Sequence, residues 1–154
     1  KANAKKKTKE VIHDYIDKNP DAMDISETEF PLTIDFEDYL VEGKVDALID
    51  DGGCKHVREY KTSDKVASMD DISLQIQAYA IEFRKQGFDV AGSVAYVEKG
   101  KVDPVDVDEK SLEKAQQKID DSVKGIQRGH YPPKVSAFCK DCDMSNICKF
   151  AKTK

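Results

Sequence analysis

Apolar residues recur along this chain with two different spacings, which predict helices and strands in the order α-β-β-β-α-β-β-α. Apolar positions three and four residues apart are typical of helices, and strict alternation is typical of strands. This order describes a single mixed α/β domain over residues 1–154. We expect helices at about 2–18, 68–86 and 108–128, and strands at 27–36, 39–50, 54–62, 90–98 and 102–107.

Two adjacent glycines, Gly52-Gly53, separate the second and third predicted strands. Because glycine takes a positive φ at both positions without strain, the pair predicts a two-residue hairpin turn. Counting outward from this turn, Asp46 faces Glu59, and two carboxylates that face each other across strands repel. A divalent cation is the natural group to neutralise them. The two-residue period of a strand also places Lys61 on the same face as Glu59.

The second strand is expected to separate apolar from polar side chains, with Asp46 on the polar face. In the strand before it, Pro31 predicts an edge or irregular strand, because proline lacks the N–H that a central strand needs. The expected apolar face of the second strand is Val41, Gly43, Val45, Ala47 and Ile49, and the polar face is Glu42, Lys44, Asp46 and Asp50.

Composition sets the broad class. The chain has 154 residues, of which 39% are hydrophobic and 36% charged, as in an ordinary globular protein. It lacks an apolar run near 18 residues and a signal-peptide pattern, so we expect a cytoplasmic protein without a membrane partner. Because it begins with Lys1, we expect a fragment of a larger protein. The net charge of −5 disfavours binding of nucleic acid by a general positive field, but it leaves room for a local DNA groove.

Further candidate groups lie outside the hairpin. Gln75 and Tyr79 are one turn apart on the second helix and point the same way. His13 lies next to the apolar stripe of the first helix, and by residue type alone it is a histidine at the edge of the core. The segment 139–148 has the spacing C-x2-C-x5-C, which indicates a metal or iron–sulfur site, although chance clustering of buried thiols is the alternative. Its cysteines are Cys139, Cys142 and Cys148.

Three short stretches, taken together in their order along the chain, resemble motifs of the PD-(D/E)XK nuclease superfamily. The resemblance is specifically to its RecB-like branch of helicase-linked exonucleases and CRISPR adaptation nucleases. The resemblance covers about residues 9–150 and implies a restriction-endonuclease-like mixed sheet flanked by helices. The matching stretches are Gly43-Lys44-Val45-Asp46 for a Gly-x-x-Asp strand, Glu59-Tyr60-Lys61-Thr62-Ser63 for an acidic-Tyr-Lys-Thr-Ser strand, and Gln75-Ile76-Gln77-Ala78-Tyr79-Ala80 for a Gln-x-x-x-Tyr helix.

The resemblance implies a site for Mg²⁺ or Mn²⁺. Asp46, Glu59 and the backbone carbonyl of Tyr60 would bind the cation, and His13 would complete the site. In the family this histidine usually stands within Gly-Thr-x-x-His, whereas the matching stretch here is Lys9-Glu10-Val11-Ile12-His13, without the glycine and the threonine.

The resemblance also implies an activity, a metal-dependent DNA nuclease that processes DNA ends exonucleolytically in repair or recombination. Lys61 would orient the attacking water, Gln75 would position Lys61 or the water, and Tyr79 would touch a DNA phosphate. The implied partners are single-stranded DNA or DNA ends and a helicase domain or subunit. One alternative is a non-catalytic nucleic-acid-binding domain of a helicase-nuclease. Another is a small zinc-binding module, which rests only on the cysteines and leaves the hairpin unexplained.

The cysteines are incomplete as an iron–sulfur site. In RecB-like nucleases with such a cluster, the C-terminal trio joins a fourth cysteine upstream of the first helix. No cysteine precedes His13 in this sequence, and Cys54 at the hairpin tip is an ordinary residue by position. Either the fourth ligand belongs to a longer protein, which would then hold a [4Fe-4S] cluster, or the cluster is degenerate. In this chain we expect an incomplete or weakly held one.

Overall fold

The computed structural model describes residues 2–62 and 68–151, so Ser63 of the predicted strand motif lies outside the described residues. The chain divides into two compact units, Lys1–Lys118 and Ile119–Lys154. The first unit contains the sheet and the predicted nuclease residues, and the second contains the three clustered cysteines. The expectation of one domain over residues 1–154 stays a prediction.

The described elements follow the predicted order, with short 3₁₀ helices added between them. The helices are α1 (Ala2–Lys18), α2 (Met69–Lys85) and α3 (Glu109–Gln127). The strands are β1 (Glu27–Asp35), β2 (Leu40–Asp50), β3 (Cys54–Lys61), β4 (Asp89–Tyr96) and β5 (Lys101–Val105). The 3₁₀ helices are η1 (Pro20–Met23), η2 (Val97–Lys99) and η3 (Ala137–Lys140). Within the described ranges, no helix is both long and apolar enough to cross a membrane.

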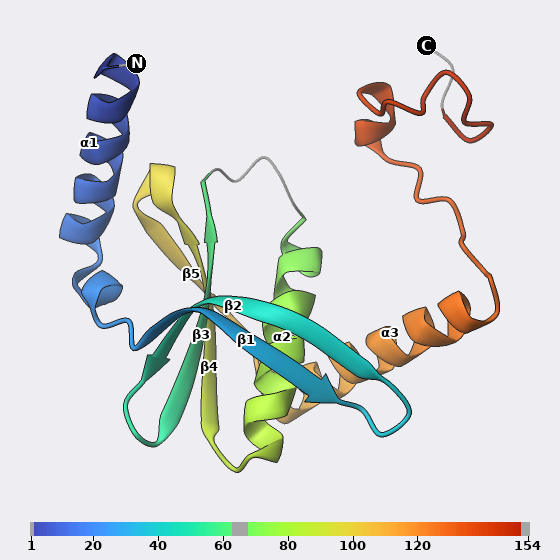
Figure 1. Cartoon of the computed structure of the whole chain (residues 1–154), viewed down its shortest axis with the longest axis horizontal. Coiled ribbons are helices and arrows are strands. Elements are labelled where there is room, and N and C mark those ends of the chain that lie inside the picture. The colour runs from blue at the N-terminus through green and yellow to red at the C-terminus, as the bar shows by residue number, and fades with distance from the viewer. Residues whose placement is uncertain (1, 63–67, 152–154) are drawn as a thin grey trace. The chain divides into compact units, whose positions relative to one another are not determined.

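The strands form one mixed sheet in the order β1-β2-β3-β4-β5. Every neighbouring pair is antiparallel except β3 and β4, which are parallel and are joined by the crossover helix α2. Figure 1 shows α1 and α2 on opposite sides of this sheet, so the predicted mixed sheet flanked by helices is confirmed. The strands β1 and β5 are the two edges, as Pro31 predicts for β1, and β5 contains Pro104.

Helices cover both faces of the central strands. On one face, Ala95 of β4 packs in a cluster with Tyr15 of α1. On the other face, a Cβ added at Gly92 of β4 would lie 2.6 Å from Cγ2 of Ile76, so α2 contacts the strand backbone. Because neither face is open to water, three consecutive side chains of β3, at positions 57–59, are buried.

The helix α2 begins and packs as its sequence predicts. The hydroxyl of Ser68 accepts the backbone N–H of Asp71 at 3.3 Å, which caps the first turn. The predicted apolar stripe faces the interior, and its members Ile72, Ile76, Tyr79, Ala80 and Phe83 are all buried. The predicted cap of α3 is also present, because Asp108 accepts the backbone N–H of Ser111 at 2.7 Å.

The β2–β3 hairpin has the predicted register. Ala47 lies opposite Arg58 and Asp50 lies opposite Lys55, as counting outward from the glycine pair requires. The described pairs stop at Ala47, one position before Asp46. The register is therefore confirmed up to the edge of the predicted site, where the two strands part.

The turn itself differs from the expected one in its second residue. Gly52 has a φ of 87°, whereas Gly53 is not among the described glycines with positive φ. The reason is the carboxylate of Asp51, which accepts the backbone N–H groups of Gly53 at 3.1 Å and of Cys54 at 2.7 Å. These bonds fix the turn with a single left-handed glycine.

The side-chain direction of β2 changes between Gly43 and Ala47. A Cβ at Gly43 would lie 2.6 Å from Cε1 of Tyr79, so position 43 faces α2. Ala47 shares a face with its partner Arg58, whose guanidinium reaches η1 on the opposite side of the sheet. Positions 43 and 47 would share one face in a regular strand. The structure therefore differs from the single apolar face expected for β2, and the change falls within the segment that contains the acid.

Candidate active site

Strand β3 presents two of the predicted residues toward the α2 side of the sheet. Glu59 is 5% exposed, and its Oε1 lies 2.6 Å from Nζ of Lys61, two residues along the strand. The lysine side chain is partly exposed, so its ammonium group reaches from solvent to a buried carboxylate. An ion pair of this kind compensates part of the cost of burying the Glu59 charge.

Asp46 lies where β2 is irregular toward both neighbouring strands. The described β1–β2 pairs include Thr28 with Ala47 and Phe30 with Val45 but skip the position between them. At that position, Glu29 of β1 has a φ of 53°, a left-handed conformation that is uncommon outside glycine. On the other side, Oδ2 of Asp46 accepts the backbone N–H of Tyr60 at 2.9 Å. At this point the Tyr60 N–H therefore binds a side chain of β2 instead of a β2 backbone carbonyl, and this bond holds the Asp46 carboxylate next to β3.

The two acids interact electrostatically, as the predicted register requires. Burial raises the pKa of Glu59 above its usual range, while Lys61 lowers it through a hydrogen bond and the negative charge of Asp46 raises it further. The contact with Gln75 lowers it slightly. The net rise means that folding disfavours the ionised form of Glu59, chiefly because burial takes the carboxylate out of water.

Helix α2 brings Gln75 and Tyr79 to this site. The amide nitrogen Nε2 of Gln75 donates to Oε2 of Glu59 at 3.1 Å and to the hydroxyl of Tyr79 at 3.3 Å. Both oxygens of Glu59 are therefore held, one by Gln75 and the other by Lys61. The one-turn spacing on α2 predicts this shared direction, and the direct contact of Gln75 with Glu59 comes from the structure.

Tyr79 lies deeper than its predicted role requires. The residue is 5% exposed, and its hydroxyl donates to the carbonyl of Lys44 at 3.1 Å and accepts the N–H of the same residue at 3.2 Å. A DNA phosphate would have to displace these partners. The phosphate contact stays a prediction that the geometry does not favour.

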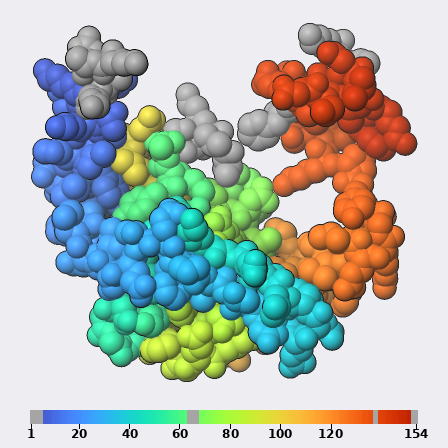
Figure 2. Space-filling model, in the orientation of Figure 1, coloured from blue at the N-terminus to red at the C-terminus, as the bar shows by residue number. Residues whose placement is uncertain are grey.

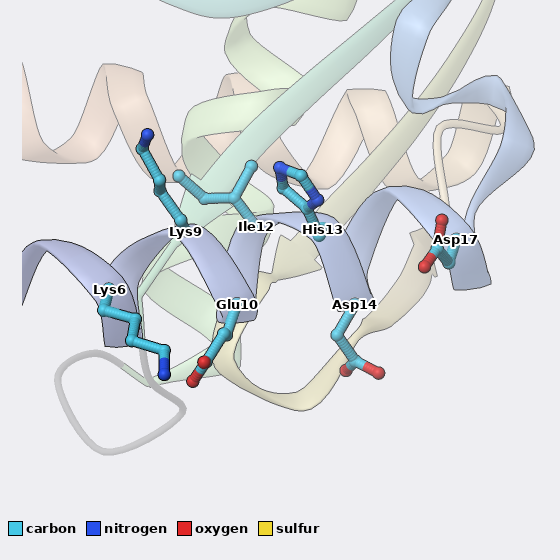
Figure 3. Close-up of a pocket in the computed structure, with 7 residues that line it drawn as sticks. All are labelled: Lys6, Lys9, Glu10, Ile12, His13, Asp14 and Asp17. Atoms are coloured by element: carbon cyan, nitrogen blue, oxygen red, sulfur yellow. The ribbon is translucent and has the colours of Figure 1, made fainter.

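His13 lies on an exposed part of α1. Figure 3 shows its ring rising from the same side of the helix as Lys9 and Ile12. Within residues 2–62 and 68–151, no three His, Cys, Asp or Glu side chains are grouped so as to hold a metal ion, so the structure does not bring His13 together with Asp46 and Glu59. His13 instead lines a surface depression formed by Lys6, Lys9, Glu10, Ile12, His13, Asp14 and Asp17 of α1.

Tyr60 connects the site to α1 through the sheet. Its ring packs edge-on against the ring of Tyr15, with centroids 6.0 Å apart and an interplanar angle of 77°. Its backbone N–H binds Asp46 on the other side. The predicted metal-binding role of its carbonyl is not tested by these contacts.

A second polar cluster, absent from the sequence predictions, lies behind the site. Arg58 is 1% exposed, and its Nη2 lies 2.6 Å from Oδ2 of Asp21 in η1. Its Nε donates to Oγ of Ser93 at 3.2 Å, and the same oxygen lies 2.8 Å from Nε2 of His56. Arg58 holds the pKa of Asp21 below its usual range, and burial followed by the Arg58 charge lowers the pKa of His56. In the sequence, the only sign of this cluster is that polar residues occupy positions 56 and 58, on one face of the strand. Such a face is usually solvent-exposed, and the sequence does not show that α1 and η1 cover it.

The three clustered cysteines lie in the second unit. Cys142 and Cys148 are exposed and Cys139 is partly exposed, and all three are free thiols. Backbone hydrogen bonds there join near neighbours in sequence, such as Cys148 N–H with the carbonyl of Met144 at 2.9 Å. The described residues hold no metal-binding group of three that includes these thiols.

The fourth cysteine, Cys54, lies in the first unit, where burial raises the pKa of its partly buried thiol.

Comparison with known families decides the class of the protein. The model of the PD-(D/E)XK nuclease superfamily matches residues 2–149. The chain belongs to this superfamily. Members of the PD-(D/E)XK superfamily are in general hydrolytic nucleases and typically use divalent metals such as Mg²⁺. The mixed sheet flanked by helices agrees with their restriction-endonuclease-like fold.

One solved structure similar to this PD-(D/E)XK chain is the crystal structure of a protein named SSO0001, with 21% sequence identity and a TM-score of 0.49. The match covers 82% of this chain and 61% of that one. This chain therefore spans less than two thirds of the length of that protein. Comparison with curated proteins gives no match.

The donor set around Glu59 fits a hard divalent cation. Asp46 and Glu59 offer carboxylate oxygens, which Mg²⁺ and Mn²⁺ prefer. A carboxylate oxygen has two lone pairs, so Glu59 can keep its bonds to Lys61 and Gln75 and still bind a cation. A cation bound there would also offset the repulsion between the charges of Asp46 and Glu59.

Proposed function

We propose that the chain is a RecB-like, Mg²⁺- or Mn²⁺-dependent deoxyribonuclease that trims DNA ends exonucleolytically in repair or recombination. The observation that carries the proposal is the buried Glu59 carboxylate, which Lys61 and Gln75 hold beside the charge of Asp46. Two acids and a lysine around one point are groups that metal-assisted phosphodiester hydrolysis uses. Membership of a nuclease superfamily supports the same reaction class.

The metal ligands in this proposal are Asp46, Glu59 and the carbonyl of Tyr60, with His13 as a fourth group. A bound divalent cation supplies Lewis acidity to the scissile phosphate and lowers the pKa of coordinated water. The hydrogen bond from the Tyr60 N–H to Asp46 fixes the direction of that carboxylate. His13 can join only if α1 presents its ring differently, because the described residues do not group it with the acids.

Lys61 acts on the reacting atoms. In hydrolysis, a water oxygen bonds to phosphorus and releases a proton to solvent, while the bond from phosphorus to the leaving deoxyribose oxygen breaks and that oxygen takes up a proton. One N–H of the Lys61 ammonium group binds Glu59, and its other N–H groups can orient the water. Its positive charge stabilises the charge that develops on the phosphoryl oxygens.

The proposed partners, location and cluster follow from the sequence resemblance. The substrate is single-stranded DNA or a DNA end, and a helicase domain or subunit would supply it. We place the protein in the cytoplasm. Cys139, Cys142 and Cys148 would be three ligands of an iron–sulfur cluster in a longer form of the protein. These assignments rest on the sequence resemblance.

The test is digestion of end-labelled single- and double-stranded DNA with Mn²⁺, comparing the chain with its Lys61→Ala variant. We expect metal-dependent cleavage by the wild-type chain and a rate about a thousandfold lower for the variant, the scale of losing one charge-stabilising group from an active site. Far-ultraviolet circular dichroism checks that the variant keeps its fold.

The matched control is Lys99→Ala, at the exposed turn between β4 and β5. This variant should cleave at the wild-type rate. Equal cleavage by Lys61→Ala would refute the assigned role of the lysine. Metal-independent DNA binding without any cleavage would instead identify a non-catalytic nucleic-acid-binding domain.

A further inference from the structure

The hydroxyl of Tyr79 acts on the backbone of β2 at the point where β2 and β3 separate. The described β2–β3 pairs end at Ala47 opposite Arg58. Three residues further from the turn, the N–H of Lys44 donates to this hydroxyl at 3.2 Å, and the carbonyl of Lys44 accepts from it at 3.1 Å. One hydroxyl thus supplies both contacts that a neighbouring strand would give to a residue in a ladder.

The ring of Tyr79 reaches this position because residue 43 is glycine. A Cβ at Gly43 would lie 2.6 Å from Cε1 and 2.8 Å from the hydroxyl oxygen of Tyr79. These distances are too short for any side chain, so the ring and the strand backbone meet only at a glycine. The Gly-x-x-Asp pattern of β2 therefore has a packing reason that is independent of the metal.

The same hydroxyl is linked to the second acid. Gln75 donates to it at 3.3 Å and to Oε2 of Glu59 at 3.1 Å. A chain of hydrogen bonds therefore runs from the Lys44 backbone through Tyr79 and Gln75 to Glu59. Lys44 is two residues before Asp46, so this chain connects the strands that carry the two acids.

We propose that Tyr79 is a positioning residue that fixes β2 where it parts from β3 and thereby sets the separation of the Asp46 and Glu59 carboxylates. The inference rests on the proposed metal-dependent nuclease function. The Tyr79 hydroxyl has one hydrogen, given to the Lys44 carbonyl, and it accepts from the Lys44 N–H and from Gln75. Its bonding capacity is used within the protein, which leaves no free group for a DNA phosphate.

The test is the Tyr79→Phe variant, which keeps the ring and removes the hydroxyl. The first readout needs no metal: amide hydrogen exchange at Lys44 should become faster, because its N–H loses its partner. The second is Mn²⁺ binding followed by electron paramagnetic resonance, where we expect the dissociation constant to rise roughly tenfold, the scale of losing a group that orients metal ligands. The third is DNA binding in EDTA, which should stay within about twofold of wild type, a change under the tenfold that 1.4 kcal/mol produces.

Two further variants frame this test. Tyr15→Phe is the matched control, because it removes a buried hydroxyl on the α1 side of the sheet and should leave Mn²⁺ binding unchanged. Gly43→Ala keeps the Tyr79 hydroxyl but pushes the ring away from β2, and it should weaken Mn²⁺ binding in the same direction as Tyr79→Phe. Weaker Mn²⁺ binding by both site variants, with DNA binding in EDTA unchanged, would support the contact between Tyr79 and β2 as the feature that sets Mn²⁺ affinity.

The outcomes separate this inference from the proposed function. Weaker DNA binding by Tyr79→Phe with unchanged Mn²⁺ affinity would overturn the positioning role and favour a phosphate contact. Unchanged Lys44 exchange and unchanged Mn²⁺ affinity would also overturn it, while leaving a nuclease that cleaves DNA intact. A wild-type chain that binds no Mn²⁺ and cleaves no DNA would refute the proposed function, and the positioning role with it.

Discussion

The two units of the chain hold their candidate ligands in different ways. The buried carboxylate of Glu59 is held by Lys61 of the same strand and by Gln75 of α2, which lies 16 positions further along the chain. Around Cys142 and Cys148, the thiols are exposed and the backbone bonds span three or four positions. In Figure 2 the β1 and β2 strands cover much of the face that the first unit presents to the viewer.

This difference separates a preorganised site from an unorganised one. Burying Glu59 costs free energy, and the protein offsets that cost with contacts that are present before any ligand arrives. The cysteine segment has no comparable set of long-range polar contacts among those described. The first site should therefore respond strongly to single substitutions, and the cysteines should behave as accessible thiols.

The largest effect is expected from Glu59→Gln, which removes a buried charge. DNA cleavage should fall at least as far as in Lys61→Ala, and Mn²⁺ affinity should fall with it, because a metal ligand is lost. In EDTA at neutral pH, the free energy of unfolding should rise instead, because folding raises the pKa of Glu59 and so disfavours its ionised form. Urea unfolding and Mn²⁺ titration of both proteins measure the two effects.

The raised pKa of Glu59 also predicts how the free energy of unfolding changes with pH. A carboxyl whose pKa is raised by folding stabilises the protein below its unfolded pKa, and this stability is lost as pH rises through the folded pKa. Wild type should therefore lose stability relative to Glu59→Gln as pH rises through the acidic range. The exposed Glu42→Gln should keep the wild-type profile. Parallel pH profiles for wild type and Glu59→Gln would contradict the assignment.

An intermediate effect is expected from Asp21→Ala, which leaves the buried Arg58 without its carboxylate. We expect the free energy of unfolding to fall by about 2 kcal/mol, less than for a fully buried pair because water screens Asp21. The side chains of Arg58 and Asp21 are 1% and 53% exposed. Urea unfolding measures the change, with the exposed Asp24→Ala as control. Equal stability of the two variants would mean that Arg58 is held by the sheet alone.

The smallest effect on the fold is expected from modification of the cysteines. Iodoacetamide should label Cys142 and Cys148 first and Cys54 last, because Cys54 is partly buried and its thiol pKa is raised. Mass spectrometry gives the order, and equimolar Zn²⁺ should not change it. Protection of Cys139, Cys142 and Cys148 by Zn²⁺ would contradict the comparison and favour a zinc-binding module.

The local features of the site were predictable from sequence. A glycine pair fixes a hairpin register, so the pairing of β2 with β3 up to Ala47 and Arg58 follows from counting. The spacing of Gln75 and Tyr79 follows from the period of a helix. These features depend on backbone geometry within a few residues, which sequence specifies directly.

The buried position of Arg58 could not be predicted in the same way. Its strand neighbours alternate as a solvated face would, and only the packing of α1 and η1 over that face buries it. The irregularity of β2 at Asp46 has a similar cause, since it depends on Tyr79 and on Glu29 of a neighbouring strand. Both features arise from contacts between segments far apart in sequence, where residue type alone does not say which element covers which.

The two prolines at the edges of the sheet bear on how this protein behaves in a crowded solution. The edge strands β1 and β5 contain Pro31 and Pro104. An edge strand with an uninterrupted row of N–H groups is a template on which another extended chain can polymerise. Proline interrupts that row on both sides, and in β1 the left-handed Glu29 bends the strand as well. The fold thus protects itself against fibrous self-association at each end of its sheet.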